Sequence, residues 1–330
     1  MTMLDVKNLS ISFKTDEGEI TPVQGVSFSV EAGKTLGLVG ESGSGKSVST
    51  KALMRLLPGN SDLSPETSIK YKNKNGDVID VEKLSYKAKT LRQLRGGEIG
   101  MIFQEPMASF SPVYTIGNQM IEAIRLHKKM SKREARQYAI EMLAKVGISS
   151  PESRIDQYPH EISGGMRQRC MIALTLSAGP ALLIADEPTT ALDVTIQAQV
   201  LELMRDLQKD LGMGMIFITH DLGVISHIAD EVAVMYLGTI VERGPTSDII
   251  HDPKHPYTRG LIEAIPSLDT LHHRLSPVPG DIPSPNERPK GCPFHTRCTQ
   301  KIEGKCDVDA PLEARVSPER LVRCWLHEEG

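Results

Sequence analysis

A glycine-rich loop between a short apolar run and a helix-prone segment constrains this chain more than any other feature. Residues 40–47 match the pattern G-x-x-x-x-G-K-[ST], after an expected buried strand at 36–39 and before the helix-prone residues 52–54. Glycines let backbone N–H groups converge on a phosphate, and the N-terminus of the following helix adds a favourable dipole. A glycine-rich turn that matched by chance would lack this strand and helix context. The loop therefore predicts a nucleoside triphosphate site.

The residues of this phosphate loop have separate expected tasks. The Lys46 side chain is expected to reach the β- and γ-phosphates, and the Ser47 hydroxyl is expected to bind Mg²⁺. The residues expected to contact the nucleotide in this loop are Gly40, Ser42, Gly43, Ser44, Gly45, Lys46 and Ser47.

A second apolar run, at residues 182–185, ends in two acids, Asp186 and Glu187. A strand that ends in Asp delivers a carboxylate to the carboxyl edge of a sheet, where α/β folds bind their ligands. We therefore expect Asp186 to bind Mg²⁺ and Glu187 to polarise the attacking water. Taken alone, the pair would be read as a strand that ends in two solvated acids, but the phosphate loop favours the functional interpretation.

Composition places the chain among globular proteins. Hydrophobic residues make up 39% and charged residues 24%, so the chain can bury a core and is not disordered as a whole. The 38 Lys and Arg against 42 Asp and Glu, a formal net charge of -4, argue against general nucleic-acid binding. No apolar run approaches the ~18 residues that span a bilayer, and residues 1–5 show no secretion signal. We expect a soluble cytosolic protein.

Alternating strand and helix patterns predict an α/β fold with a largely parallel sheet. Residues 26–30 alternate as a half-buried strand, and 215–218 are a buried-strand candidate that follows an amphipathic stretch at 196–211. In the polar segment 60–95, the Asn75-Gly76 pair predicts a hairpin turn. After about residue 245, prolines become frequent, and this tail is expected to be a separate, irregular appendage.

A loop near the middle of the chain resembles the signature motif of the ATP-binding cassette (ABC) ATPases, whose usual form is LSGGQ. Ser163, Gly164 and Gly165 keep the centre that touches phosphate, while Ile162 and Met166 replace the outer Leu and Gln. A loop of small residues that opens a helix can present N–H groups and a hydroxyl to an anion. Taken alone, the same residues could be a plain helix cap.

Further landmarks occur in the order that the ABC family requires. Gln104 matches the Q-loop, Asp193 the D-loop, and His220 the switch histidine after the strand at 215–219. Phe13 stands where an adenine-stacking aromatic is expected, although an aromatic residue in an early strand is more often part of the core. The resemblance implies an α/β P-loop NTPase of the ABC cassette type, with a mainly parallel sheet core, an antiparallel β-subdomain and a helical subdomain.

More narrowly, the chain resembles the ATP-binding subunit of a dipeptide/oligopeptide-type ABC importer, from the oligopeptide/dipeptide permease ATPase family. The run YPHE at 158–161 leads into the signature, and residues 185–193 have the sequence typical of that subfamily. The run HPYT at 255–258 opens its C-terminal extension. This resemblance covers essentially the whole chain. It implies a cassette over 1–250 and an extension over 251–330, with the helical subdomain at about 105–180.

The resemblance also implies a mechanism. Two ATPase domains pair head to tail, and each ATP lies between the phosphate loop of one subunit and the signature of the other. Glu187 would act as general base, His220 would hold and sense the γ-phosphate, and Ser47, Gln104 and Asp186 would surround Mg²⁺. One half-site would consist of Lys46, Ser47, Gln104, Asp186, Glu187 and His220. Ser163 and Gly165 would complete the partner's site, and Gly164 and Asp193 are further residues expected to bind nucleotide.

The partners implied are a second, similar ATPase subunit, two transmembrane permeases and an extracytoplasmic solute-binding protein, with no nucleic acid. The chain would work as a peripheral protein on the cytoplasmic face of the inner membrane. The Gln104 region and the helical stretch after it would form the docking groove for the permeases. Relatives that import nickel, opine-like compounds or oligosaccharides remain alternatives for the solute. A soluble ABC ATPase of DNA repair or translation is a less favoured alternative. Such chains tend to carry long coiled coils or two cassettes in tandem, whereas this chain has a single phosphate loop and no extended heptads. Intact Glu187 and His220 argue against a non-hydrolysing regulatory subunit.

Four of the five cysteines lie in the tail, at Cys292, Cys298, Cys306 and Cys324, whereas Cys170 is expected to be a buried core thiol. Clustered thiols in a cytosolic chain favour a metal over disulfides. The spacings of 5, 7 and 17 intervening residues match neither close zinc-binding pairs nor ferredoxins. Spacing therefore leaves iron–sulfur, zinc and free thiols open. Some importers of this subfamily hold a [4Fe-4S] cluster in a similar quartet, so the resemblance implies that cluster here.

Overall fold

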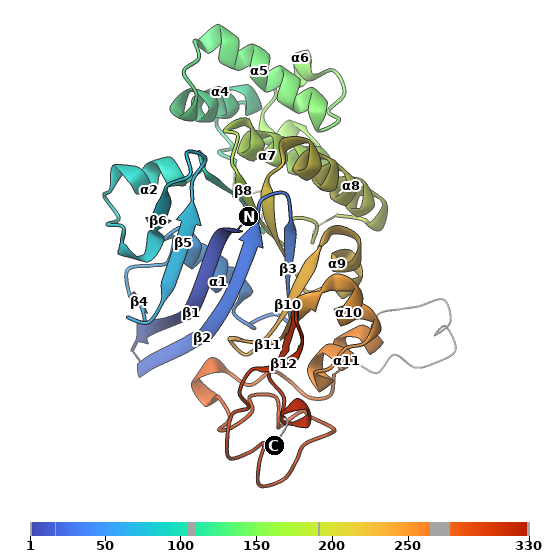
Figure 1. The fold of residues 1–330 in the computed structure, drawn as a ribbon. Coiled ribbons are helices and arrows are strands. Elements are labelled where there is room, and N and C mark those ends of the chain that lie inside the picture. The colour runs from blue at the N-terminus through green and yellow to red at the C-terminus, as the bar shows by residue number, and fades with distance from the viewer. Residues whose placement is uncertain (1, 17, 105–109, 191, 265–277, 329–330) are drawn as a thin grey trace.

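A computed structural model of the chain describes residues 2–16, 18–104, 110–190, 192–264 and 278–328. Figure 1 shows its three regions: green helices at the top, two sheets in the middle, and the orange-to-red end of the chain at the bottom.

The larger sheet is mixed, and its centre is parallel. Five neighbouring strands, in the order β10-β3-β9-β8-β7, pair in parallel, while β11, β13 and β12 continue the sheet beyond β10 with antiparallel pairing. Its strands are β12 (Ala314–Ser317), β13 (Arg320–Val322), β11 (Thr239–Pro245), β10 (Glu231–Tyr236), β3 (Thr35–Val39), β9 (Gly214–Thr219), β8 (Leu182–Asp186) and β7 (Ile99–Ile102). The predicted α/β fold with a mainly parallel core is confirmed.

The smaller sheet is antiparallel, and two long strands dominate it. It runs β2-β1-β5-β6, and β4 also pairs with β1. Its strands are β1 (Thr2–Thr15), β2 (Gly18–Glu31), β4 (Ser61–Leu63), β5 (Ser68–Lys72) and β6 (Val78–Asp80). The predicted hairpin turn joins β5 to β6, and Gly76 adopts a φ of 91°, which a glycine tolerates without steric cost.

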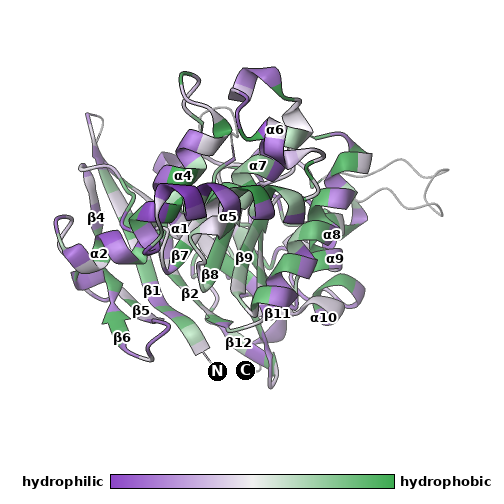
Figure 2. Cartoon of the chain, turned by 90° about the horizontal axis from the view of Figure 1, so that it is seen from above, coloured by the Kyte–Doolittle hydropathy of each residue, from purple (hydrophilic) through white to green (hydrophobic). Residues whose placement is uncertain are grey.

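Period-two alternation in the parallel strands places the larger sheet between two cores. In β9, Met215 and Phe217 face the core under the helices, whereas Ile216 and Ile218 face the core shared with the smaller sheet. Since successive strand side chains point to opposite faces, a strand that is apolar throughout must be covered on both sides. Figure 2 shows β8 and β9 in hydrophobic colours beneath the mostly hydrophilic helix at Lys132–Lys145.

The helices cover the sheet and form the separate group at the top of Figure 1. They are α1 (Lys46–Leu53), α2 (Lys89–Leu94), α4 (Ile116–His127), α5 (Lys132–Lys145), α6 (Pro151–Arg154), α7 (Gly164–Ser177), α8 (Val194–Leu211), α9 (Leu222–Ile228), α10 (Thr246–His251) and α11 (Pro256–Glu263). Between α4 and α5, Ser131 starts a new helix through a capping box with Glu134. Among the described residues, no helix is both long and apolar enough to cross a bilayer.

The end of the chain differs from the separate appendage that its composition predicts. Much of it is irregular, but β13 pairs with β11, so the hairpin of β12 and β13 extends the larger sheet. A buried ion pair reinforces this junction: Arg320 Nη2 lies 2.7 Å from Glu242 Oε1, and the two side chains are 4% and 0% exposed. Glu242 also accepts the backbone N–H groups of Lys254 and His255. The tail therefore packs as part of the main sheet.

We predict that Arg320→Met lowers the free energy of unfolding by about 3–5 kcal/mol, because it leaves the Glu242 carboxylate buried without its cation. Urea unfolding monitored by circular dichroism measures the change. The control is Lys14→Met, which removes the exposed Lys14–Asp62 pair and should leave stability unchanged within error. Equal stabilities for both variants would contradict a structural role for the buried pair.

Candidate functional site

The phosphate loop joins the end of β3 to the start of α1, and its three glycines, Gly40, Gly43 and Gly45, adopt backbone conformations that other residues avoid. Gly45 precedes α1 with a φ of 98°. Gly40 has a φ of 156°, and a Cβ there would collide with the backbone oxygen of Met235. These constraints explain why the loop can approach its neighbours so closely.

The Lys46 ammonium lies inside the loop. Its Nζ donates to the carbonyl oxygens of Gly40 at 2.6 Å and Glu41 at 2.9 Å, and the residue is 5% exposed. Burial lowers the pKa of Lys46, while the nearby carboxylates, above all Glu187, act in the opposite direction. Phosphate oxygens can replace these carbonyl acceptors at little cost, because they supply the negative charge that would balance the buried ammonium.

Ser47 and Asp186 meet at the carboxyl edge of the sheet, one from α1 and the other from β8. The Ser47 hydroxyl donates to Asp186 Oδ1 at 2.9 Å, and Asp186 is 2% exposed. Burial raises the pKa of Asp186, and the Ser47 hydrogen bond partly opposes that shift. A hydroxyl and a carboxylate are oxygen ligands of the kind that Mg²⁺ takes alongside phosphate oxygens and water. These residues therefore fit the predicted ion.

Glu187 lies at the centre of a hydrogen-bonded group from three separate loops. Its Oε2 accepts from Gln104 Nε2 at 3.1 Å and from the Thr190 hydroxyl at 2.9 Å, and its Oε1 lies 3.3 Å from His220 Nδ1. The Glu187 backbone has a positive φ of 46°, and its N–H donates to Ile218 of β9. The structure thus brings together Gln104, Glu187 and His220, which are far apart in the sequence.

The signature and the D-loop lie at the starts of two helices. The Ser163 hydroxyl accepts the Met166 N–H at the start of α7, and the Asp193 carboxylate accepts the Ile196 N–H at the start of α8. Ser163 and Gly164 are exposed, and Gly165 lies close to Ile196. Within the described ranges, no hydrogen bond joins the signature to the phosphate loop of the same chain.

Phe13 lies on β1 opposite Ile20, half-buried against the core that the two sheets share. This position leaves part of its ring accessible. The expected stacking of Phe13 on adenine stays a prediction. Cys170, by contrast, is buried in the main core, and burial raises the pKa of its thiol to about 12.

The four tail cysteines lie close enough to influence one another. Burial raises the pKa of Cys292 to about 12 and that of Cys324 to about 11, and the remaining thiols of the quartet contribute in the same direction. The Cys298 and Cys306 sulfurs accept backbone N–H groups at 3.4 Å. Even so, within the residues that the structure describes, no group of three or more His, Cys, Asp or Glu side chains is placed to hold a metal ion.

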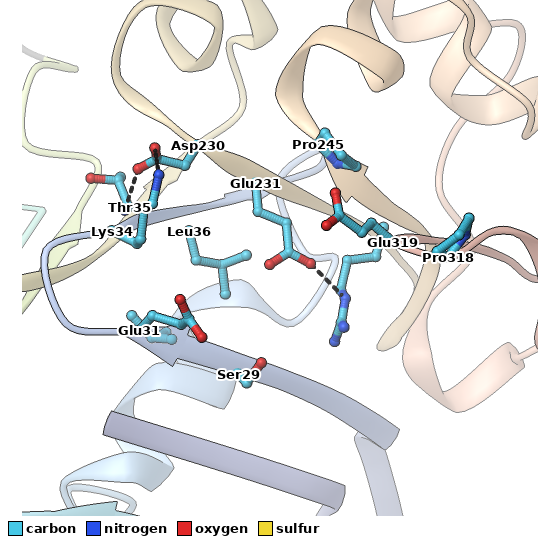
Figure 3. A pocket seen from close by; sticks show the side chains of 12 residues that line it. Ser29, Glu31, Lys34, Thr35, Leu36, Asp230, Glu231, Pro245, Pro318 and Glu319 are labelled. Atoms are coloured by element: carbon cyan, nitrogen blue, oxygen red, sulfur yellow. Dashed lines mark hydrogen bonds and ion pairs between the residues drawn. The ribbon is translucent and has the colours of Figure 1, made fainter. Parts of the chain in front are cut away.

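A cavity of about 480 Å³ lies elsewhere, between the two sheets and the tail (Figure 3). Its charged side chains are largely paired: Lys34 contacts Asp230 at 2.8 Å, and Arg243 contacts Glu231 at 2.9 Å. Burial raises the pKa of Glu231, while Arg243 opposes the shift. No phosphate-loop residue lines this cavity, so it is distinct from the candidate nucleotide site.

Sequence reasoning missed three side chains at the site. Thr190 contacts Glu187 directly, and its position three residues further along could have suggested this. Tyr257 and Arg297 contact Glu41 of the phosphate loop from the C-terminal part of the chain, 216 and 256 residues away. No sequence pattern predicts contacts over such separations.

The parallel sheet, the phosphate loop and the acids at the end of β8 define a phosphate-loop NTPase. The family model described as "ABC transporter" matches residues 23–190, and the one described as "Oligopeptide/dipeptide transporter, C-terminal region" matches residues 241–306. The chain therefore belongs to the ABC transporter family.

Curated relatives resemble the chain over nearly its full length. The oligopeptide transport ATP-binding protein OppD of Bacillus subtilis is 47% identical over 325 residues, which is 98% of this chain and 88% of the relative. The dipeptide transport ATP-binding protein DppD of the same organism is 47% identical over 327 residues, which is 99% of this chain and 95% of the relative.

Solved structures support the same fold over the cassette. The dimeric ABC transporter cassette MJ0796 superposes with a TM-score of 0.64 at 24% identity, over 74% of this chain and 99% of that one. The cbiO1 protein of Clostridium perfringens, part of the ABC transporter complex cbiONQ, gives a TM-score of 0.63 at 25% identity, over 76% and 91%.

We predict that Asp186→Asn stabilises the nucleotide-free protein by on the order of 1 kcal/mol at neutral pH, because the Asp186 carboxylate is buried at the expense of stability. The folded state raises the pKa above its ordinary 3.8, so ionisation opposes folding, and the gain should grow as the pH rises above that value. Urea unfolding at several pH values measures it. The exposed Asp206→Asn on α8 is the control, and a loss of stability in Asp186→Asn would contradict the prediction.

Proposed function

We propose that this chain is the ATP-hydrolysing subunit that powers the import of di- or oligopeptides through a membrane ABC transporter. The observation that carries the peptide assignment is the 47% identity to oligopeptide and dipeptide transport ATP-binding proteins over almost the whole chain, including the tail. The hydrogen-bonded group around Glu187 supports the hydrolytic assignment.

The proposed roles follow from what each side chain contacts. Lys46 exchanges its carbonyl acceptors for β- and γ-phosphate oxygens. Ser47 and Asp186 hold Mg²⁺, which neutralises charge that develops on the phosphates. The Gln104 amide nitrogen already donates to Glu187, which leaves its oxygen for the ion.

Glu187 is the proposed general base for the attacking water, and His220 the group that holds the γ-phosphate. The Glu187 side chain is only 12% exposed, and hydrogen bonds from Gln104 and Thr190 orient its carboxylate. His220 is 57% exposed, so it can turn towards a phosphate without breaking core packing. Phosphoryl transfer depends mainly on such positioning and on charge stabilisation.

We infer that the second half of each site comes from another ATPase subunit. The exposed signature residues Ser163 and Gly164 present the N-terminus of α7, which favours anions. In this arrangement Gly165 and Asp193 lie beside the partner's nucleotide. The resemblance to the peptide importers favours a similar but different chain, and therefore a heterodimer.

The proposed complex also needs two permeases and an extracytoplasmic solute-binding protein, with this chain on the cytoplasmic face of the membrane. A cavity of about 570 Å³ on α4 presents the exposed Tyr114 and Leu126 among polar and charged side chains, and it offers a surface for a permease segment. We propose the cassette over residues 1–250, with its helical subdomain at about 105–180, and the extension over 251–330. Phe13 is proposed to stack on adenine.

The iron–sulfur assignment of Cys292, Cys298, Cys306 and Cys324 is also a proposal. The backbone N–H donors to the Cys298 and Cys306 sulfurs suit thiolate ligands. Burial and mutual repulsion raise the pKa of Cys292 and Cys324, and the positive charge of bound iron would offset that effect. A cluster spreads its cysteines over several iron atoms, so its ligands lie further apart than those of one zinc ion. When bound, a cluster would hold the loops of the tail together.

We predict that Glu187→Gln abolishes ATP hydrolysis at this subunit's phosphate loop in the purified complex, while the chain still binds ATP. Loss of the proposed base should reduce turnover at least ~10²-fold. Phosphate release and nucleotide binding are measured side by side. Unchanged hydrolysis at that site would contradict the catalytic assignment.

Uptake of a labelled dipeptide tests the transport assignment. Cells that lack this chain should regain uptake with the wild type and not with Glu187→Gln. Uptake that never depended on the chain, after exclusion of a redundant peptide system, would reject the peptide assignment and move the search to nickel, opine-like compounds and oligosaccharides.

For the cysteine quartet, we predict that anaerobically purified protein is brown and contains about four iron and four sulfide ions per chain. Replacement of Cys298 by Ser should remove most of the iron. Cys170→Ser is the matched control, because that thiol lies in the main core. Colourless, iron-free anaerobic protein would rule out the iron–sulfur assignment. Stoichiometric zinc in that protein would show that the cysteines form a zinc site instead.

A further inference from the structure

The C-terminal part of the chain contacts the phosphate loop directly, through a forked ion pair. Arg297 Nη1 lies 2.8 Å from Glu41 Oε2, and Arg297 Nη2 lies 3.1 Å from Glu41 Oε1. The Arg297 side chain is 4% exposed and that of Glu41 is 31% exposed. Such bidentate pairs restrict geometry more than a single hydrogen bond does.

Arg297 is itself rigidly held. Its Nε donates to the Pro279 carbonyl at 2.8 Å, and Nη2 donates to the Val278 carbonyl at 3.2 Å. Its guanidinium lies 5.7 Å from the centre of the Tyr236 ring at the end of β10. Every nitrogen of the fork therefore has an acceptor, so the position of the guanidinium depends on the fold of the tail around it.

A second contact fixes the backbone of the same loop residue. The Glu41 N–H donates to the Tyr257 hydroxyl at 3.0 Å, and Tyr257 is a fully buried side chain in the first turn of α11. The Tyr257 ring packs against Tyr236 at 4.7 Å and Phe294 at 5.3 Å between ring centres. This aromatic group connects the end of β10, α11 and the cysteine-bearing segment.

The other side of the loop is supported in the same way. The Gly238 N–H donates to the Ser44 carbonyl at 2.9 Å, so the turn between β10 and β11 lies against the phosphate loop. Arg288, from the tail, donates to the carbonyl of Leu237 in that turn at 2.6 Å. Two arginines of the tail thus reach the loop, one directly and one through the turn.

We propose that Arg297 is a positioning residue of the phosphate loop, so that the affinity for MgATP depends on the folded state of the C-terminal extension. The inference rests on the proposed function as an ATPase. Its physical basis is twofold: the fork holds the loop backbone next to Lys46, and it neutralises a carboxylate that would otherwise repel the triphosphate.

The location of Arg297 gives this coupling a consequence for the tail. Arg297 directly precedes Cys298, whose sulfur accepts the Gln300 N–H, and Phe294 of the aromatic group lies two residues after Cys292. A rearrangement of the cysteine-bearing loops would therefore move the guanidinium that holds Glu41. The extension is then part of the nucleotide site as well as part of the sheet.

The test compares MgATP binding to full-length variants. Arg297→Met should raise the Kd about tenfold, whereas Glu41→Gln, which removes the repelling charge together with the fork, should raise it less than about threefold. The double variant should bind no more weakly than Arg297→Met, because the two side chains act through each other. Arg315→Met is the matched control, since that arginine is exposed and, among the residues that the structure describes, its side chain bonds to Pro318 within the β12–β13 hairpin.

A merely structural role would lower stability without moving the nucleotide constants. In the purified complex, Arg297→Met should raise the KM for ATP about tenfold and change kcat less than about twofold, because the contact between Glu187 and His220 lies on other loops than the one that Arg297 holds. Urea unfolding of the same variants reports stability separately. A Kd and a KM within twofold of those of Arg315→Met would overturn the proposal.

If Arg297→Met fails to fold, Arg297→Lys decides the question, since it keeps the charge and loses the fork. It should still weaken MgATP binding relative to Arg315→Met, and unchanged binding would overturn the proposal. Failure of the proposed function has a different signature: the wild type itself would then bind no MgATP.

Discussion

The adjacency of β3, β8 and β9 in a parallel sheet is the constraint on which the site depends. Their carboxyl ends meet at one edge, so the phosphate loop, the Asp186-Glu187 pair and the His220 loop emerge side by side. Each strand is apolar on both faces and must be covered twice. The helices cover one face and the smaller sheet the other, and the polar loops remain at the open edge.

At that edge, the protein maintains charges in places that reduce stability. Lys46 and Asp186 are nearly fully buried. Burial lowers the pKa of Lys46 and raises that of Asp186, and both shifts favour the neutral form of the side chain. A site of this kind is suited to a highly charged ligand, because phosphates and a divalent cation supply the countercharges that the buried groups lack. In this structure the Ser47 hydroxyl donates to Asp186, and a loop carbonyl accepts from Lys46.

The C-terminal tail is not structurally separate from the rest of the chain. Two strands of it extend the main sheet, the buried pair of Arg320 and Glu242 holds this junction, and Arg297 reaches Glu41. Much of the segment is irregular, yet its arginines contact the rest of the chain at defined points. It therefore packs as part of the main sheet and against the phosphate loop.

The sequence by itself determined the parts that depend on local pattern. The phosphate loop, the apolar strands and the Asn75-Gly76 turn are encoded by neighbouring residues, so their positions could be predicted. Gln104 and His220 were found only through a family resemblance, since no local chemistry links them to Glu187. Only the tertiary structure decided that these side chains share hydrogen bonds and that Arg297 meets Glu41 across 256 residues. Such contacts depend on how the strands are ordered and how the tail folds back, and neither is written in the spacing of the residues involved.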